Sequence, residues 1–411
     1  MYIKKNPVIV FILAWGFLTI LAWADNYIPD PRISMILYGL TYIIFVYSSY
    51  LLINDFEFES SYFKHVFYIL ILYEFFIIVH GIHLNGVGPV SVNSVYWTIR
   101  GGYYQIWPLV IPFFVFFDKK ISNFVVLFEW IFRLGVLALI LLPIFPSIYS
   151  TRALSVNLPG LTYGCGILLL FATYINDKKI NISLVAIFIT LLTFTYLARR
   201  NNIVTILGFI LSGYLINMRS SFSPKSFKLF PLFFVLGITL AISLTNYTNL
   251  LTSKLSERLT EDSRSDVLVS FFAEMEDYMV FGKGINGTYY SPSGGEIEDE
   301  GIVFAEVDYR DQIEVGYLQL VLDGGIAYVI LFLLVLVPAA INGIFRSNNL
   351  FAKACGFIIF LWLIDMFIFG LPILSFHYIF VWICIGVCYK TSIRQKTDDE
   401  IWLEFENALH I

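Results

Sequence analysis

The chain has 411 residues, of which 58% are hydrophobic, 18% aromatic and only 14% charged, with a formal net charge of −5. Soluble domains are about half apolar and about a quarter charged, so this composition argues against an ordinary soluble enzyme, and no nucleic-acid partner is expected. A mean hydropathy of +0.77 is typical of a polytopic membrane protein.

Apolar runs near the length of about 20 residues that crosses a bilayer recur along the whole chain. The first follows a short basic flank and resembles a signal peptide, but it is long for one and a second run follows soon after, so an uncleaved helix is expected. Two joints between runs are very short, "ARRNN" at 198–202 and "GLP" at 370–372. The sequence predicts an all-α fold with about twelve transmembrane helices, near 7–24, 34–53, 65–82, 101–117, 123–146, 160–175, 180–197, 202–218, 229–247, 317–341, 353–371 and 373–390.

The four cysteines all lie inside apolar runs, at Cys165, Cys355, Cys384 and Cys388. They show no zinc spacing with histidine and cannot form a disulfide framework in a water-exposed domain. We expect them to be small packing residues, and we expect neither a metal nor a cofactor.

Basic residues alternate between loops in a way that sets the orientation by the positive-inside rule. One set of loops holds twelve lysines and three arginines and is expected to be cytoplasmic, together with both termini. The expected organisation is nine helices in 1–247, a large periplasmic loop at 248–316, three helices in 317–390 and a cytoplasmic tail at 391–411.

The outer set of loops prefers arginine to lysine, with eight arginines and two lysines. A guanidinium group presents a planar fork of donors that grips phosphate oxygens in pairs. The pattern favours an outward-facing site for a lipid-linked phosphate or diphosphate, although single arginines also snorkel at interfaces and pair with acidic loops. The outer arginines are Arg32, Arg100, Arg152, Arg199, Arg200, Arg258, Arg264 and Arg310.

The segment 248–316 holds fifteen acidic and five basic residues, a net charge of −10. Only local arginines, with acids held away, would bind a phosphate there. Within it, "SRSDVLVSFFAEMEDYMVFGKGI" predicts an amphipathic helix that begins at Ser263, with Asp266 in a capping-box position, and ends at Gly282 and Gly284. Its apolar face is expected either on the outer membrane surface or packed onto the helical bundle.

The next helix opens with "RDQIEVGYLQLVLDGG" at 310–325. Arg310 and Glu314 are four positions apart, so a helix beginning before the membrane would bring them onto one face, with Tyr317 beside them. A carboxylate followed by two glycines, at 323–325, predicts a spot where another segment or a ligand approaches the backbone closely.

Three features in this order resemble the O-antigen and capsule repeat-unit polymerase family of the Wzy type and the related O-antigen ligases. They are the arginine-rich outer end of a middle helix, "LARRNN"; the outer loop with "SRSD" and "FGKGI"; and "EVGYLQLVLDGGI" opening the next helix. The resemblance covers roughly residues 185 to 340.

The resemblance implies a metal-independent glycosyltransferase of the GT-C type on the outer face of the bacterial inner membrane. Its substrates would be undecaprenyl-diphosphate-linked glycans, and it would make O-antigen for lipopolysaccharide, or capsule, with a flippase and a chain-length regulator as possible partners. Ligases carry a histidine before the "GYLQL"-like helix, whereas 248–316 contains no histidine and has Glu314 in that region, which favours a polymerase. The family's serine before the arginine is missing, which leaves open whether Arg199 or Arg200 faces the site.

The resulting site hypothesis assigns Arg264, Arg199 and Arg200 to the diphosphate and Glu314 to the acceptor hydroxyl as general base. Arg310, Tyr317 and Asp266 would support them. Arg100 is a weaker candidate on another outer loop, and His80 and His83 are more often a solvated helix end than a catalytic pair.

A lipid-linked oligosaccharide flippase or another transporter is the main alternative. Transporters commonly show internal repeats and intramembrane charge along a path, whereas this chain shows no convincing repeat. Its ionisable residues within predicted spans are few: Glu74, Glu129, Arg133 and Asp365. Glu129 and Arg133 are one turn apart and are expected to pair.

Overall fold

A computed structural model gives the structure of the protein. The predicted helix at 229–247 and the candidate residues Arg100, Arg199 and Glu314 lie outside the residues that it describes. The described residues are 7–24, 31–53, 56–85, 107–141, 163–196, 200–218, 263–285, 287–290, 309–311, 313, 315–367 and 375–409.

The described chain is mostly helical, as predicted. Residues 163–170 are also helical, and the only strands among the described residues are the short antiparallel pair β1 (Tyr289–Tyr290) and β2 (Tyr309–Arg310). The α-helices are α1 (Pro7–Ala24), α2 (Pro31–Leu52), α3 (Ser61–Asn85), α5 (Trp107–Val110), α6 (Ile121–Leu141), α8 (Asp177–Tyr196), α9 (Arg200–Asn217), α12 (Ser263–Glu274), α13 (Gly316–Phe345), α14 (Leu350–Asp365), α15 (Phe376–Tyr389), α16 (Thr391–Arg394) and α17 (Asp398–Leu409). The 3₁₀ helices are η2 (Ile111–Phe116), η4 (Ala172–Tyr174) and η6 (Glu276–Tyr278).

The described part of the predicted span 101–117 is a short α-helical turn followed by the 3₁₀ helix η2. Pro108 and Pro112 lie in this stretch. Proline has no N–H to donate along a helix, which explains why the regular α-helical ladder does not extend through it.

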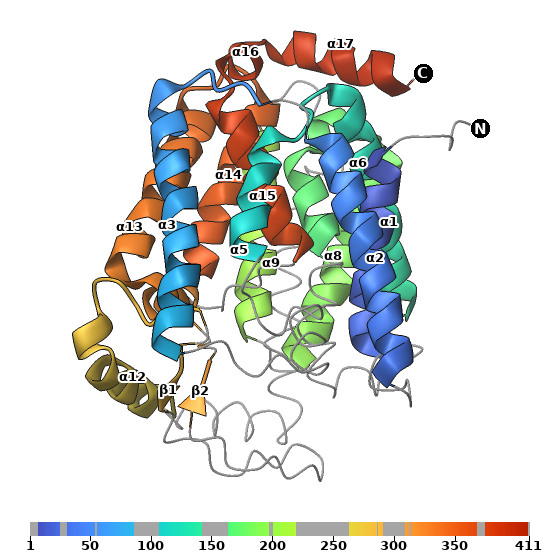
Figure 1. Ribbon diagram of the computed structural model, residues 1–411. Coiled ribbons are helices and arrows are strands. Elements are labelled where there is room, and N and C mark those ends of the chain that lie inside the picture. Colours follow the sequence, from blue (N-terminus) through green and yellow to red (C-terminus); the bar gives the residue numbers. More distant parts are fainter. Residues whose placement is uncertain are drawn as a thin grey trace.

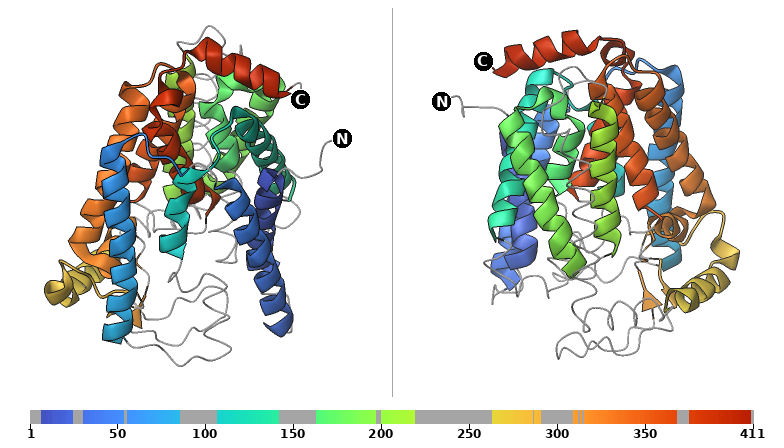
Figure 2. Two further views of the ribbon diagram at one scale, coloured as in Figure 1. Left: turned by 45° about the horizontal axis from the view of Figure 1, so that its top comes forward. Right: turned by 180° about the vertical axis from the view of Figure 1, so that it is seen from behind.

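The long helices form a bundle whose two ends differ (Figure 1, Figure 2). The amphipathic helix α17 lies across one end, which we call the α17 end, while α12, β1 and β2 lie at the other, the α12 end. The helix α13 runs from the α12 end to the α17 end, where Asn348 follows it and bonds to the carbonyl of Arg394 in α16.

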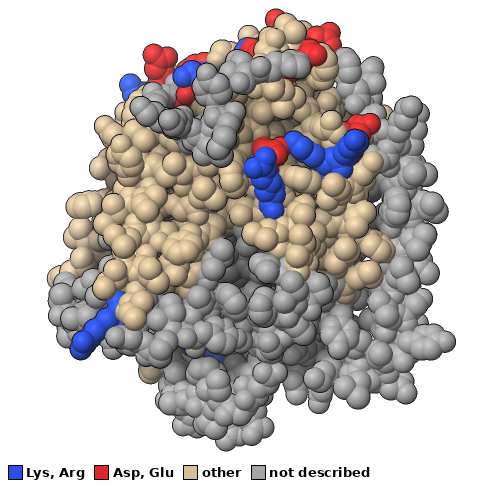
Figure 3. Space-filling view, turned by 90° about the vertical axis from the view of Figure 1, so that its right-hand side faces the viewer, with Lys and Arg blue, Asp and Glu red and all other residues tan. Residues whose placement is uncertain are grey.

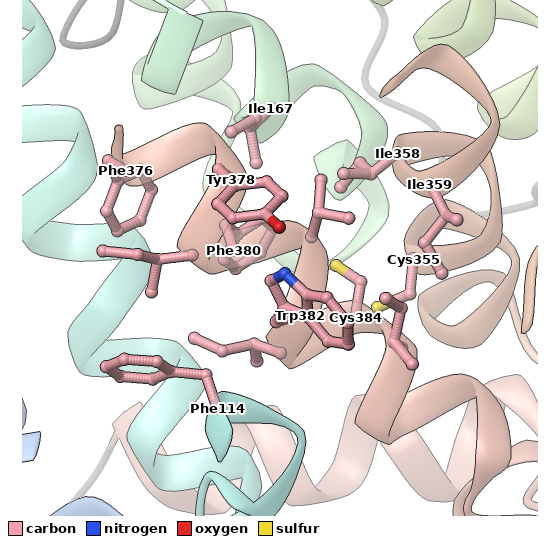
Figure 4. Close-up of a cluster of buried hydrophobic side chains, with 14 of the residues drawn as sticks. Phe114, Ile167, Cys355, Ile358, Ile359, Phe376, Tyr378, Phe380, Trp382 and Cys384 are labelled. Atoms are coloured by element: carbon pink, nitrogen blue, oxygen red, sulfur yellow. The ribbon is translucent and has the colours of Figure 1, made fainter. Parts of the chain in front are cut away.

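The centre of the bundle is α15. All fourteen of its residues are buried, and it packs between α13, α14 and η2. Its neighbours are aromatic, aliphatic and sulfur-containing side chains, among which Trp382, Cys384 and Cys355 lie together (Figure 4). The four cysteines are free and buried, which agrees with their predicted role as packing residues.

The outer faces of three helices are apolar rather than polar. The exposed side chains recur at spacings of three or four residues, so each helix presents a continuous stripe to its surroundings. The members are Ile36, Leu40, Ile43, Tyr47 and Tyr50 on α2; Tyr68, Leu72, Phe75, Val79 and Ile82 on α3; and Ile326, Ile330, Leu334, Val337, Ile341 and Phe345 on α13.

Two helices among the described residues are long and apolar enough to cross a membrane, α3 with 25 residues and α13 with 30. At a rise of about 1.5 Å per residue both exceed the hydrocarbon thickness of about 30 Å. The count of twelve spans stays a prediction. Shorter apolar helices occur at Pro7–Leu18, Ile36–Leu52, Asn202–Asn217 and Phe376–Tyr389.

The predicted helix that begins at Ser263 is confirmed as α12, but this α-helix ends at Glu274, before its predicted end at Gly282 and Gly284. Phe271 on this helix and Met275, directly after its end, are fully buried in a small cluster with Tyr289, Ile313 and Leu322. This part of the apolar face therefore packs onto the protein, which was the second of the two expectations.

The helix α13 is broken near its beginning, at Gly325, which has a φ of 68°. The segment 279–285, which we call the strap, lies against the break. Lys283 and Gly284 donate their N–H groups to the carbonyls of Leu322 and Asp323, and the carbonyls of Met279 and Val280 accept from Ile326 and Ala327. These four hydrogen bonds give the backbone groups around the break in α13 the partners that a regular helix would have provided.

The backbone of the strap lies so close to that of α13 that glycine is required at this break. A Cβ added to Gly325 would lie 2.2 Å from the carbonyl carbon and oxygen of Val280, and one added to Gly282 would lie 2.5 Å from the nitrogen of Gly324. The prediction that another segment approaches the backbone at 323–325 is thereby confirmed, and the partner is the strap.

Candidate functional site

The predicted site residues whose backbone is described lie at the α12 end. Arg264 and Asp266 are in the first turn of α12, Arg310 is in β2, and Tyr317 is the second residue of α13. Arg200 is the first residue of α9. The side chains of Arg200, Arg264 and Asp266, like all of Arg199, Glu314 and Arg100, lie outside the described part.

The direction of α9 follows from contacts at its far end. Asn217, its last residue, accepts hydrogen bonds from the backbone N–H and hydroxyl of Thr173. The next residue, Tyr174, donates its hydroxyl to Asp398 of α17 at 3.0 Å. Because α9 ends at the α17 end, Arg200 begins it at the α12 end.

The prediction that Arg310 and Glu314 share a helical face is wrong. Arg310 is in the strand β2, opposite Tyr289, and α13 begins only at Gly316, after the extended residue Val315. Because Arg310 takes part in cross-strand pairing with β1, helical spacing does not relate its position to that of Glu314.

Tyr317 ties the start of α13 to the end of α14. Its hydroxyl donates to the carbonyl of Leu363 at 2.9 Å, and its ring lies 4.5 Å from that of Phe367, centroid to centroid. The hydroxyl is therefore engaged with backbone, and the residue holds two helices at the α12 end in place.

A polar cluster lies where the starts of α9 and α15 meet the end of α14. We call Tyr163, Asn202, Thr205, Asp365 and His377 the α9 cluster. The hydroxyl of Tyr163 donates to Asn202 at 2.6 Å, and that of Thr205 donates to a carboxylate oxygen of Asp365 at 2.6 Å. Thr205 is also within hydrogen-bonding reach of Tyr163, so four of the five side chains form one network.

His377 is buried within aromatic rings in this cluster. Its ring centroid lies 4.9 Å from that of Trp362, 5.4 Å from Phe209 and 6.1 Å from Tyr163. Its Nε2 has no hydrogen-bond partner among the described residues. Buried polar atoms are ordinarily paired, so this nitrogen makes the α9 cluster a candidate for a functional role.

A second polar cluster surrounds the break in α13. We call Glu74, Gln319, Asp323 and Tyr328 the α13 cluster. Gln319 donates to Asp323 at 3.0 Å and accepts from the backbone N–H of Ile313 at 2.9 Å. Tyr328 donates to Glu74 at 3.1 Å, and the second carboxylate oxygen of Glu74 is buried without a partner in the described part.

Three acids of these clusters share one property. Within the described part of the chain, Glu74, Asp323 and Asp365 accept hydrogen bonds only from hydroxyl or amide groups and have no lysine or arginine partner. Carboxyl groups held among apolar helices without a cation are costly and are commonly functional. They therefore form the chemically distinctive part of the described α12-end half of the bundle.

One acid outside the helices, just before α13, has a shifted pKa. Burial raises the pKa of the Asp311 carboxyl above its ordinary value, against a smaller opposing effect of a backbone hydrogen bond. The backbone carbonyl of Asp311 accepts from Gln319 at 3.3 Å, so this residue adjoins the α13 cluster.

The two histidines near the end of α3 have different surroundings. His80 Nε2 lies 3.3 Å from the carbonyl of Gly282 in the strap, and its ring stacks on Phe76. His83 is exposed. The nearby Asn85 donates to the carbonyls of Lys283 and Ile285 at 2.9 Å, so this end of α3 chiefly holds the strap.

Sequence reasoning missed most members of the two clusters. It singled out Glu74, Asp323 and Asp365 as acids near or within predicted spans, which is the signal that leads to both clusters. Their uncharged partners, Tyr163, Asn202 and Gln319, carry no such signal, because tyrosine and amide side chains are common in apolar helices without a polar role. His377 could have been found as an ionisable residue inside the predicted span 373–390.

No group of histidine, cysteine and acidic side chains suited to a metal ion occurs among the described residues. Comparison of the sequence with models of known families, and of the chain with curated proteins and solved structures, finds no match.

Proposed function

We propose that this chain is a polytopic membrane glycosyltransferase with about twelve transmembrane helices. It joins undecaprenyl-diphosphate-linked oligosaccharide repeat units into O-antigen or capsular polysaccharide on the outer face of the bacterial inner membrane. The supporting observation is that Arg200, Arg264 and Arg310 all begin or lie on elements of the α12 end. That end adjoins the three acids of the two polar clusters that have no lysine or arginine partner in the described part of the chain.

The apolar stripes on α2, α3 and α13 support the membrane location. A helix facing water carries polar residues on its outer face, and contiguous exposed apolar surface marks contact with lipid or protein. The α17 end carries a further sign of orientation, because Arg346, Lys353, Lys390, Arg394 and Lys396 gather on the described elements there. By the positive-inside rule that end is cytoplasmic, and the α12 end is periplasmic.

The chemistry assigns a role to each kind of residue. The bond broken joins the anomeric carbon of the donor sugar to the lipid diphosphate, which leaves with its electron pair. The bond formed joins that carbon to a hydroxyl of the acceptor repeat unit, whose proton passes to Glu314 as general base. Arg264 and Arg199 or Arg200 neutralise the charge that develops on the diphosphate, with Arg310 and Asp266 in support.

The α9 and α13 clusters are suited to hold sugar hydroxyls beside that reaction. Carboxylate, amide and imidazole groups form hydrogen bonds with hydroxyl groups. A site built on such groups rejects substrates that lack the hydroxyls. Tyr317 holds the start of α13 to the end of α14 beside this region, so its contribution is to position rather than to react.

The test replaces Arg264 or Glu314 with alanine in a strain that lacks the native gene, with Arg346→Ala at the α17 end as the matched control. Gels of surface polysaccharide should show loss of long ladders and retention of single repeat units for the first two variants. The control should keep normal ladders. Normal ladders at normal protein levels would remove Arg264 or Glu314 from the site.

Two further measurements separate this proposal from its rivals. Deletion of the gene should leave single repeat units on the surface lipid, whereas loss of a flippase leaves none and loss of a ligase leaves polymer on the undecaprenyl carrier. Purified protein with lipid-linked repeat units should form polymer without added metal. Failure to form polymer with an intact, correctly folded protein would count against a polymerase.

A further inference from the structure

Three charged side chains meet on the outer faces of α6 and α8. Glu129 accepts from Arg133 at 3.0 Å, as the sequence predicted, and its other oxygen pairs with Lys179. Arg133 also lies over the ring of Trp130, with its guanidinium carbon 5.1 Å from the ring centroid. On the side of the molecule where α6 lies, small groups of charged side chains interrupt a largely uncharged described surface (Figure 3).

This trio carries more positive than negative charge. Two cations share one carboxylate, which leaves a net charge of about +1. The Arg133 side chain is 57% exposed and that of Lys179 is 34% exposed. A guanidinium group has five N–H donors in a fixed fork, and Glu129 engages only Nε and Nη2 of Arg133, so donors remain for a second anion.

Glu129 and Lys179 lie toward the α17 end. Phe128, next to Glu129, stacks at 6.2 Å on Phe405 of α17, and Lys179 is the third residue of α8. Tryptophan and arginine at such a boundary are typical of the headgroup level of a bilayer.

An apolar strip leads away from the trio toward the α12 end. On α6 it follows Arg133 at intervals of four and three residues, and on α8 it follows Lys179 at intervals of three and four, so both rows stay on one side of the two helices. The two helices pack against each other. The exposed members are Leu137 and Ile140 on α6 and Ile182, Val185 and Ile189 on α8.

We propose that Arg133, Lys179 and Trp130 form a binding site for an anionic phospholipid of the cytoplasmic leaflet. The phosphate oxygens bind the guanidinium and ammonium groups, and an acyl chain lies along the apolar strip. A zwitterionic headgroup brings its own cation, which the net positive trio disfavours. The inference rests on the membrane location proposed above and not on polymerase activity.

The test measures lipid retention by native mass spectrometry of the purified full-length protein. The protein in a neutral detergent is mixed with equal amounts of phosphatidylglycerol and phosphatidylcholine. The wild type should retain phosphatidylglycerol preferentially. Arg133→Gln should lower the retained ratio by about fivefold, the factor that corresponds to about 1 kcal/mol for one basic residue near a membrane surface.

Two further variants test the direction of the change in the lipid ratio and provide a control. Glu129→Gln should raise the ratio, because it removes the anion that masks both cations, whereas a purely structural ion pair predicts no gain in lipid. Arg346→Gln, an exposed arginine at the end of α13, should leave the ratio unchanged. If Arg133→Gln is not monodisperse on size exclusion, Lys179→Gln replaces it with the same expectation.

Three outcomes would overturn the proposal: equal retention of the two lipids by the wild type, the same ratio in wild type, Arg133→Gln and Glu129→Gln, or displacement of phosphatidylglycerol by excess inorganic phosphate. The last would indicate a soluble-anion site that makes no use of the strip. Because the measurement needs no polymer formation, its result is independent of the ladders that test the enzymatic proposal.

Discussion

The helices α15 and α3 are both apolar along their length, yet their surroundings are opposite. Every residue of α15 is buried, whereas only seven of the 25 residues of α3 are. Apolar residues therefore serve two purposes in this chain: contact between helices and, on our proposal, contact with lipid. Composition does not separate the two, because lipid tails are as apolar as the interior of the bundle.

The largest expected effect is the difference in stability between removing a phenyl ring from α15 and removing one from α3. Phe380→Ala in α15 deletes a fully buried ring that lies 5.7 Å from Phe376 and 6.2 Å from Phe171. Such truncations cost about 3–5 kcal/mol. Phe75→Ala in α3 deletes a ring that is 58% exposed and should cost less than about 0.5 kcal/mol. Thermal melting in a neutral detergent compares the two, and equal losses would contradict the difference in burial.

The next effect distinguishes lipid from water on the outer face of α3. Phe75→Lys places a charge in the apolar stripe, which costs about 2.5–3.5 kcal/mol at the centre of a membrane-spanning helix. We expect a marked loss of membrane-inserted protein, measured by fractionation and alkaline extraction. Tyr62→Lys, at an exposed position near the start of α3, is the control and should insert normally. Normal insertion of Phe75→Lys would indicate that this face meets water.

A smaller effect is expected at two helical glycines. A Cβ on Gly386 of α15 would lie 2.2 Å from the carbonyl oxygen of Val115, whereas one on Gly39 of α2 would meet nothing within 4 Å. Gly386→Ala should destabilise by about 1–3 kcal/mol through overpacking. Gly39→Ala should be neutral or stabilise by up to about 1 kcal/mol through helix propensity. The same sign for both in thermal melts would refute the packing difference.

The smallest effect concerns pH at the start of α13. Because burial raises the folded-state pKa of Asp311, ionisation of this carboxyl opposes folding, and stability falls as pH rises above its unfolded pKa of about 3.9. Asp311→Asn should raise the Tm at neutral pH by no more than about 2 °C. The gain should shrink toward pH 4. Asp399→Asn on the exposed start of α17 is the control, and an identical pH profile for both variants would contradict the prediction.

The sequence predicted the helices better than the site. The run at 317–341 corresponds to α13, and the close approach of another segment at its glycines was expected, because a carboxylate followed by two glycines is a poor lipid-facing sequence. The break in the helix at Gly325 was not predicted. The Glu129–Arg133 pair followed from helical spacing alone. In contrast, Lys179 in the same trio comes from another helix, and only packing brings it there.

The same limit explains the error at Arg310. Local spacing favoured a helix through Arg310 and Glu314, but the partner strand β1 is about twenty residues away in sequence and decides the conformation. The α9 cluster was not predicted for the same reason, because Asn202 and Tyr163, or Thr205 and Asp365, meet only after three helical segments pack. Long-range contacts of uncharged polar residues leave no periodic pattern to read.

The strap has a consequence for how the α12 end can move. Four backbone groups of α13 depend on it, and pulling it away would leave them unpaired among apolar side chains, at a cost of several kcal/mol for each group. The strap and the first turns of α13 are therefore expected to move together. Any motion imposed on α12 therefore passes into α13, which leads directly to the α17 end.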